Sequence, residues 1–429
     1  MLGMNRKLAK LEENGTPILT GIIGAGQMGK GMVSQMLAMK GMRPSFVADI
    51  NIDSAKDALI HAGIAEDQIA VIETAEEGNK ALAEGKYLIS TNGLLAPQIE
   101  KLDAVVDATG VPQVGARVAI DTIFAKKHII MLNVETDVVI GPLLKKWADN
   151  AGVVYTGSHG DEPGAVMELY DFATALGYDV RVIGKGKNNK LDFDANPDSV
   201  LEEATRRGVS PKMLTAFKDG TKTMVEMTAM SNATGYLPDV RGAHGPSGGV
   251  EDLPGMFMTK EEGGILSDYK KVDFVNGVAP GVFIIVSSPL PEVHTEMKYL
   301  SMGDGPNYVL YRPYHLCSLE TPLTVAHAVL NEEPTIVPMA GPISECIAVA
   351  KTDLKAGQML DGIGGYTVYG TIEVAAKAKE EGALPLGLIN KKTKLIVDKK
   401  KGDIITYADV ELDQTNLIVQ LRQLQDQMF

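Results

Sequence analysis

The sequence predicts an α/β protein that opens with a Rossmann-type, doubly wound parallel sheet. Over roughly the first 160 residues, short segments rich in Val, Ile and Leu alternate with amphipathic helical segments. Such alternation is typical of a parallel sheet covered on both faces. A Gly-x-Gly-x-x-Gly spacing also lies between the first apolar segment and the first helical one. This is the context in which the spacing indicates a dinucleotide site.

The elements follow in order along the chain. Strands are predicted at 17–23, 43–50, 86–91, 103–109, 127–134 and 152–158, with helices at 27–39, 54–63 and 111–127 between them. A chain of 429 residues exceeds one ordinary core. We therefore expect an NAD(P)-binding domain at 1–160, an α+β catalytic and oligomerisation domain at 161–338, and a small β-rich domain with a C-terminal tail at 339–429.

The glycine turn carries the cofactor prediction. Gly24 permits the tight turn, Gly26 lets the backbone approach a pyrophosphate, and Gly29 lets helix and strand pack closely. The following helix offers free N–H groups to the anion. The predicted cofactor-binding residues are Gly24, Gly26, Gln27, Met28, Gly29, Asp49, Thr109 and Gly110.

Asp49 favours NAD over NADP. It lies 20 residues after Gly29, where a carboxylate accepts hydrogen bonds from the ribose and repels a 2′-phosphate. No arginine follows to neutralise such a phosphate, and the helix N-cap role is supplied by Asp53 or Ser54. The cofactor prediction is NAD, with NADP left open.

The segment after the next predicted strand is rich in lysine. Lys185, Lys187 and Asn188 lie beside glycines where that strand runs out, and they would bind a phosphate or carboxylate through charge-assisted hydrogen bonds. The alternative is a solvated turn whose lysines serve solubility.

Lys222 and Glu226 share one face of a predicted helix among several methionines. If they are buried, the lysine becomes a candidate proton donor for carbonyl reduction. If they are exposed, the pair needs no function. A divalent cation, Mg²⁺ or Mn²⁺, held by Glu226 with Asp192 or Asp194 is a further hypothesis.

A long irregular loop at 236–256 contains Arg241 and His244. Both would contact an anionic substrate, and His244 would act as an acid if the loop closes over it. The alternative is that they are incidental charges of a mobile loop. Arg312 and His315 are further substrate-binding candidates, with a structural role as the alternative for His315. The seven histidines form no H-E-x-x-H or Cys/His pattern, so nothing indicates structural zinc.

Composition limits the class of protein. The net charge of −14 disfavours non-specific nucleic-acid binding, and two cysteines make no disulfide framework. No apolar run approaches the ~20 residues of a membrane span, and the start lacks a signal-peptide pattern. We expect a cytoplasmic homo-oligomer, dimer or tetramer, whose partner is a small anionic substrate rather than nucleic acid or membrane.

Two C-terminal stretches, "AVAKTDLKAGQML" and "KKKGDIITYADVEL", resemble the ends of a SAF domain, a small β-clip module. Joined to a homoserine-dehydrogenase-like nucleotide domain, this arrangement is similar to the 1-deoxy-D-xylulose 5-phosphate reductoisomerase-like oxidoreductases. The matching stretches span about 17–412 and are "GIIGAGQMGKGM", "DATGVPQVGA", "GDEPGAVMELYDFA", "VIGKGKNN", "FKDGTKTMVEMT" and "RGAHGP".

The resemblance implies a nicotinamide-dependent oxidoreductase that acts on a small phosphorylated or acidic carbonyl compound. The best-known activity belongs to isoprenoid biosynthesis and forms 2-C-methyl-D-erythritol 4-phosphate with NADPH. Asp49 departs from an NADP-selective site. The alternatives are a homoserine dehydrogenase, a sugar-acid or polyol-phosphate dehydrogenase, and a non-catalytic dinucleotide sensor. The resemblance places these residues around the substrate: Lys185, Lys187, Asn188, Arg241, His244 and His315.

Overall fold

The computed structural model describes residues 3–429 and divides the chain into two compact units. The first unit runs to Gly164 and includes Leu316–Val337; the second comprises Ala165–His315 and Pro338–Phe429. This grouping differs from the expected three-part division in two ways. Residues 316–337 pack with the nucleotide-binding part, and the C-terminal β-rich part packs with the middle of the chain.

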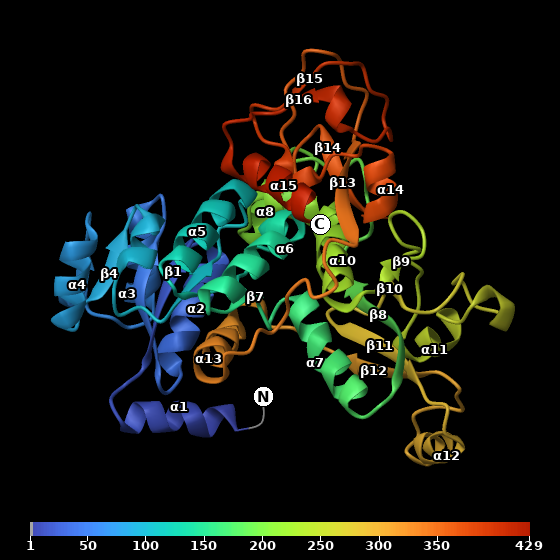
Figure 1. Ribbon diagram of the computed structural model, residues 1–429, viewed down its shortest axis with the longest axis horizontal. Helices are drawn as coiled ribbons and strands as arrows, with labels where there is room; N and C mark the ends of the chain where they lie inside the picture. The colour runs from blue at the N-terminus through green and yellow to red at the C-terminus, as the bar shows by residue number, and fades with distance from the viewer. Residues whose placement is uncertain (1–2) are drawn as a thin grey trace. The chain divides into compact units, whose positions relative to one another are not determined.

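The first unit is built on a seven-stranded sheet in the order β3-β4-β2-β1-β5-β6-β7, with every neighbouring pair parallel. Figure 1 labels β1, β4 and β7 of this sheet. This confirms the predicted doubly wound sheet. Short β3 is the strand that the sequence analysis missed. The strands are β1 (Ile18–Ile23), β2 (Met42–Ala48), β3 (Ile69–Val71), β4 (Tyr87–Ser90), β5 (Ala104–Asp107), β6 (His128–Met131) and β7 (Tyr155–Gly157).

Helices cover both faces of this sheet. One face packs against α2, α3 and α13, with α1 beside them, and the other against α5, α6 and the 3₁₀ segment Gly93–Gln98. The returning helix α13 buries Val325, Ala326 and Ala328 in the same core as β1 and β6, which is why it groups with this unit. The helices are α1 (Met4–Glu13), α2 (Gln27–Ala38), α3 (Ile52–His61), α4 (Ala75–Ala83), α5 (Pro112–Phe124), α6 (Val134–Ala151) and α13 (Thr321–Asn331).

The second unit contains a five-stranded mixed sheet in the order β12-β11-β8-β10-β9. β8 pairs in parallel with β10 and antiparallel with β11. Two small antiparallel pairs, β13 with β14 and β15 with β16, form the C-terminal part. The strands are β8 (Asp179–Lys187), β9 (Leu237–Pro238), β10 (Lys271–Asn276), β11 (Val282–Ser287), β12 (Tyr308–Arg312), β13 (Ser344–Ala350), β14 (Val368–Val374), β15 (Lys394–Leu395) and β16 (Val410–Glu411).

Helix α10 is the central helix of this unit, buried along most of its length. It packs against β8 and β10 of the mixed sheet and against β13 and β14. The helical stretch predicted around it divides into α8, α9 and α10 because Gly208 and Gly220 adopt φ angles of 66° and 86°. The helices are α7 (Glu162–Ala175), α8 (Leu201–Arg207), α9 (Pro211–Lys218), α10 (Thr221–Thr234), α11 (Leu253–Met256), α12 (Pro291–Tyr299), α14 (Ala375–Glu380) and α15 (Leu417–Met428).

Hydrogen bonds join α10 to the C-terminal strands. The Asn232 amide oxygen accepts from the Ile343 and Ser344 N–H groups at 3.0 and 2.9 Å, and the Thr221 hydroxyl accepts from the Gly370 N–H at 2.9 Å. The β-rich part predicted from the sequence is therefore present, and it packs with the middle of the chain in one compact unit. Across residues 3–429, no helix combines the length and apolar character needed to cross a membrane.

Candidate functional site

The glycine turn of the first unit follows β1 at the point where the strand order reverses, with β2 on one side and β5 on the other. Ligands of open α/β sheets bind at such a point. Gly24 has a φ of 100°, and a Cβ there would lie 2.8 Å from the Ala108 carbonyl oxygen. A Cβ on Gly29 would lie 1.9 Å from the Gly24 carbonyl oxygen. The fold itself therefore requires the first and third glycines.

At Gly26 the fold does not require a glycine. Its φ of −70° suits any residue, and a Cβ would meet nothing within 4 Å. It directly precedes α2, whose first N–H groups have no side-chain cap. Open space at an uncapped helix start fits a pyrophosphate, so the turn passes the structural test for a dinucleotide.

Asp49 is half-buried at the end of β2, as expected. One carboxylate oxygen accepts from the Ala25 N–H at 2.8 Å and the other from the Asn51 N–H at 2.9 Å. The side chain thus also holds the glycine turn against β2, a role that spacing alone does not reveal.

Thr109 and Gly110 follow β5, and Gly110 adopts a φ of 63°. Their conformation depends on two residues that the sequence analysis did not select. The buried Asp107 carboxylate accepts from the Thr109 N–H at 3.0 Å and from the Asn133 amide at 2.9 Å. Burial raises the pKa of Asp107 above its usual range. Asn133 also caps α6, so this corner is held by a buried polar network.

In the second unit, Lys185 and Lys187 lie inside β8 and not in a solvated turn, and they are only 4% and 5% exposed. They alternate with Gly184 and Gly186, which leave room on the opposite face for Phe283 and Val278. The sequence Gly-Lys-Gly-Lys therefore directs both ammonium groups to one face of the sheet.

Each lysine has a partner on the helices covering that face. Lys185 forms an ion pair with Glu226 of α10, which is 1% exposed. The Lys187 ammonium donates to the Phe217 carbonyl of α9 at 2.7 Å. Burial, with repulsion from Lys185 added, lowers the pKa of Lys187 to about 8. We call Lys185, Lys187 and Glu226 the lysine cluster.

Glu226 of α10 has a partner on β8 that helical spacing does not reveal, and the pairing of Lys222 with Glu226 stays a prediction. The carboxylate of Glu226 contacts Lys185 from β8, while Lys222 is half-buried at the start of α10. Asn188 is exposed at the end of β8, where it accepts from the Asn189 amide at 3.0 Å. Asp194 contacts Lys401, and among the described residues neither Asp192 nor Asp194 joins Glu226 in a set of three or more acidic, His or Cys ligands.

The turn at 241–245 is held rigidly. Arg241 donates to Glu373 at 2.5 Å and to both oxygens of Glu381 at 2.7 and 2.6 Å. These bonds fix its guanidinium at the edge of the cavity, and its role in substrate binding stays a prediction. Buried Asp273 accepts from the N–H groups of His244 and Gly245 at 3.1 and 3.0 Å, and burial raises its pKa to about 6.

His244 is oriented by a carboxylate. Its Nε2 lies 2.7 Å from an Asp239 oxygen, and its ring lines a cavity of about 320 Å³. Phe274 and Asn276, which also line this cavity, are the register partners of Lys185 and Lys187 on β10. Partners on neighbouring strands point to the same face, so the cavity lies on the face that carries the lysine cluster. The remaining lining residues are Leu191, Phe193, Arg241, Gly242, Ala243, Gly245, Val349, Tyr369, Thr371, Gly402 and Ile404.

Arg312 and His315 lie at the other edge of the sheet. Arg312 is buried at the end of β12, 3.5 Å from a Glu168 oxygen and 4.6 Å from the centre of the Tyr314 ring. His315 is half-buried three residues further on. Neither residue lines the cavity.

Comparison with known proteins concerns mainly the second unit. Residues 160–321, less than half of the chain, match a family model described as the catalytic domain of oxidoreductase DRL. The matched segment contains the lysine cluster and the turn at 241–245. No curated protein matches the sequence significantly.

Solved structures resemble the chain only distantly. A probable dehydrogenase from Thermotoga maritima is 13% identical, with a TM-score of 0.43 over 75% of this chain and 92% of that one. A UDP-N-acetylglucosamine 3-dehydrogenase from Acidithiobacillus ferrooxidans is 11% identical, with a TM-score of 0.40 over the same shares. The fold assignment rests instead on the strand order itself. With its dinucleotide-type turn and the match to an oxidoreductase catalytic domain, the chain is an NAD(P)-dependent oxidoreductase.

Substitutions of two glycines of the turn should have separable effects. Gly26→Ala leaves the melting temperature unchanged, because its Cβ meets open space, but weakens dinucleotide binding at least about tenfold. Gly29→Ala lowers the melting temperature by several degrees, because its Cβ overlaps the Gly24 carbonyl. Differential scanning fluorimetry and calorimetric titration with NAD measure both. Equal loss of stability in the two variants would contradict this assignment.

Lys187→Met is expected to stabilise the protein at pH 7. The folded-state pKa of about 8 lies below the unfolded value of 10.5, so below pH 8 the charged lysine costs the folded state stability, and that cost disappears as the pH rises toward 10.5. The gain is about 2 kcal/mol after allowance for the Phe217 carbonyl left without its donor.

Urea unfolding at a series of pH values between 7 and 10 measures this difference. Lys190→Met, which removes an exposed lysine three residues away, is the matched control and should change little. A Lys187→Met protein that is less stable than wild type at pH 7, or whose advantage does not shrink with rising pH, would contradict the account.

Proposed function

We propose that this protein transfers hydride between NAD and a small anionic carbonyl compound, with the lysine cluster as its catalytic group. The observation that carries this proposal is Lys187: a lysine inside a strand, nearly fully buried, with its pKa lowered to about 8 and a second lysine two residues away. Burying two like charges is costly, and such arrangements concentrate at functional sites.

The residues of the cluster have complementary chemical roles. A bound nicotinamide supplies or accepts the hydride. Lys187, with its pKa near neutrality, can give a proton to the carbonyl oxygen and take it back in the reverse direction. Lys185 is held in place by its ion pair with Glu226, and its ammonium stabilises negative charge that develops on the same oxygen. Two ammonium groups on one face also favour an anionic substrate over a neutral one.

His244 is the second candidate for the proton donor. Its imidazole is oriented by Asp239 and lines the cavity, which is the arrangement of a general acid or base. The two candidates differ in the pH dependence of turnover. A donor at Lys187 keeps reduction active up to about pH 8, and this limit should then persist when His244 is replaced and disappear when Lys187 is replaced.

The candidate substrates come from the sequence resemblance described above. A 1-deoxy-D-xylulose 5-phosphate reductoisomerase-like reaction is the first candidate, and aspartate semialdehyde or a sugar-acid or polyol-phosphate substrate is the alternative. The divalent cation, the SAF assignment of the C-terminal part and the homo-oligomer remain predictions. A non-catalytic dinucleotide sensor is disfavoured by the match to an oxidoreductase catalytic domain.

Turnover of purified protein, followed by nicotinamide absorbance, tests the proposal. NADH and NADPH are paired with 1-deoxy-D-xylulose 5-phosphate, aspartate semialdehyde and four-carbon sugar acids, with and without Mg²⁺ or Mn²⁺. We expect Lys187→Met to lose turnover at least about a hundredfold while it still binds dinucleotide, and Lys190→Met to remain active. Unchanged turnover in Lys187→Met would overturn the role of the cluster.

Asp49 predicts the cofactor preference. Asp49→Asn keeps an acceptor for the Ala25 N–H but removes the charge that repels a 2′-phosphate, so kcat/KM for NADPH should rise at least about tenfold relative to NADH. Asp49→Ala also removes the acceptor and should weaken both cofactors. A ratio that does not respond to Asp49→Asn would show that another residue selects the cofactor.

A further inference from the structure

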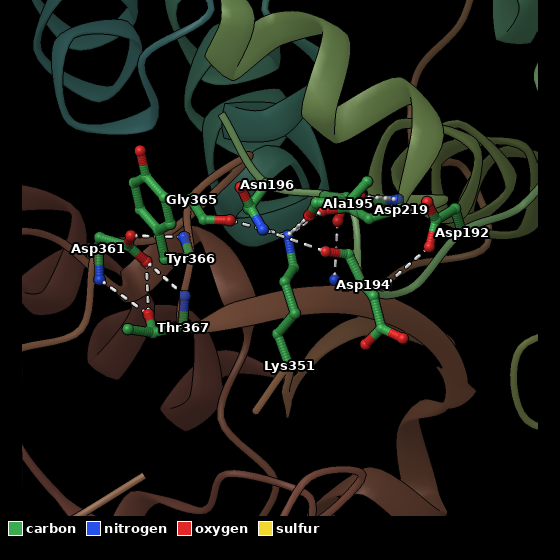
Figure 2. Close-up of polar contacts among 12 residues, drawn as sticks. Asp192, Asp194, Ala195, Asn196, Asp219, Lys351, Asp361, Gly365, Tyr366 and Thr367 are labelled. Atoms are coloured by element: carbon green, nitrogen blue, oxygen red, sulfur yellow. Dashed lines mark hydrogen bonds and ion pairs between the residues drawn. The ribbon is translucent and has the colours of Figure 1, made fainter. Parts of the chain in front are cut away.

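Lys351 is a second buried lysine site, in the C-terminal part of the chain. It directly follows β13 and is 3% exposed. Its ammonium donates to the Ala195 carbonyl, the Gly365 carbonyl and an Asp219 carboxylate oxygen, each at 2.8 Å (Figure 2). An ammonium has three N–H donors, so all three are used.

The acceptors form an oxygen cradle that is suited to a cation. Asp219 is fully buried, and its second carboxylate oxygen accepts from the Thr221 N–H at 2.9 Å. A buried carboxylate needs a compensating positive charge. Two main-chain carbonyls complete the set, and Lys351 supplies the charge on a side chain tethered to β13.

Three segments that are far apart in the sequence meet at this ammonium. Ala195 lies in the segment that follows β8, Asp219 lies between α9 and α10, and Gly365 lies in the loop between β13 and β14. That loop is itself held closed, because Asp361 accepts from the N–H groups of Tyr366 and Thr367 at 2.6 and 3.1 Å (Figure 2). The cradle therefore has a rigid side contributed by the C-terminal part.

The same segments position the lysine cluster. Phe217, whose carbonyl accepts from Lys187, is two residues before Asp219. Glu226, which holds Lys185, lies on the helix that starts two residues after Asp219. The segment that contains Ala195 is also bonded to α9, since the Asp192 N–H donates to the Lys218 carbonyl at 2.9 Å. A shift at Asp219 would move the partners of both catalytic lysines.

We propose that Lys351 is a positioning residue for the lysine cluster, a tethered cation by which the C-terminal part fixes the start of α10 and the segment after β8. The inference rests on the proposed function. It assigns residues 338–429 a part in the reaction: they pack against α10 and so help to hold the partners of the catalytic lysines in place.

Chemical rescue tests the proposal. Lys351→Ala removes the side chain beyond Cβ, so propylammonium restores the missing atoms and charge. We expect Lys351→Ala to lower the melting temperature and to lower kcat at least about tenfold with little change in the KM for dinucleotide. Propylammonium should restore both quantities, whereas tetramethylammonium, which has no N–H donor, should restore neither. In Lys351→Met the side-chain space is filled, so no rescue is expected.

The pH profile distinguishes positioning from general stabilisation. If Lys351 positions the cluster, the upper limb of the pH profile of kcat moves in Lys351→Ala and returns with propylammonium. A lower melting temperature with unchanged kcat and pH profile would overturn the proposal. If Lys351→Ala does not fold, Asp219→Asn keeps the shape of the cradle and removes its charge, and it should lower the melting temperature and kcat and move the pH profile, without a rescue step.

The stability readout separates this inference from the proposed function. Rescue of the melting temperature by propylammonium is independent of turnover. If wild-type protein turns over no substrate, the proposed function fails, and Lys187 titration then reports the effect of Lys351→Ala on the cluster. A Lys187 pKa that is unchanged in Lys351→Ala would overturn the inference in that case as well.

Discussion

Much of the second unit depends on the burial of positive charge on one strand. Lys185 and Lys187 are two residues apart on β8, and both are withdrawn from water. Two ammonium groups at this spacing repel each other, and neither is tolerated without acceptors. Glu226 neutralises one of them, and the Phe217 carbonyl accepts from the other. The requirement for these acceptors fixes where α9 ends and how α10 lies on the sheet.

The same requirement explains why the C-terminal part belongs to this unit. α10 has the mixed sheet on one side and β13 and β14 on the other, so it is buried almost completely. Polar groups at its start and near its end then need internal partners. Asp219 finds one in Lys351, Thr221 in the Gly370 N–H and Asn232 in the main chain at Ser344. Lys187 and Lys351, which are far apart in the sequence, therefore both bind the segment that leads into α10, at Phe217 and Asp219.

Local patterns in the sequence were enough to predict the glycine turn, the position of Asp49 at the end of its strand and the parallel sheet. Each of these depends on residues that are close along the chain. Pairings across long separations could not be predicted. Helical spacing points Glu226 toward Lys222 but does not reveal that strand alternation also presents Lys185 to Glu226. Arg241 is engaged by Glu373 and Glu381, more than a hundred residues away, and α13 joins the first unit after the whole of the mixed sheet. Such contacts are set by packing, which spacing rules do not encode.

The ionisation of Lys187 tests the central claim most directly. Lysine ammonium groups can be titrated individually by NMR in protein labelled with carbon-13 at Cε, and Lys187→Met assigns the signal. The account predicts one lysine that titrates near pH 8 and is absent from the variant. A Lys187 signal that titrates near the ordinary value of 10.5 would contradict it, since the proposed proton donor would then have no special acidity.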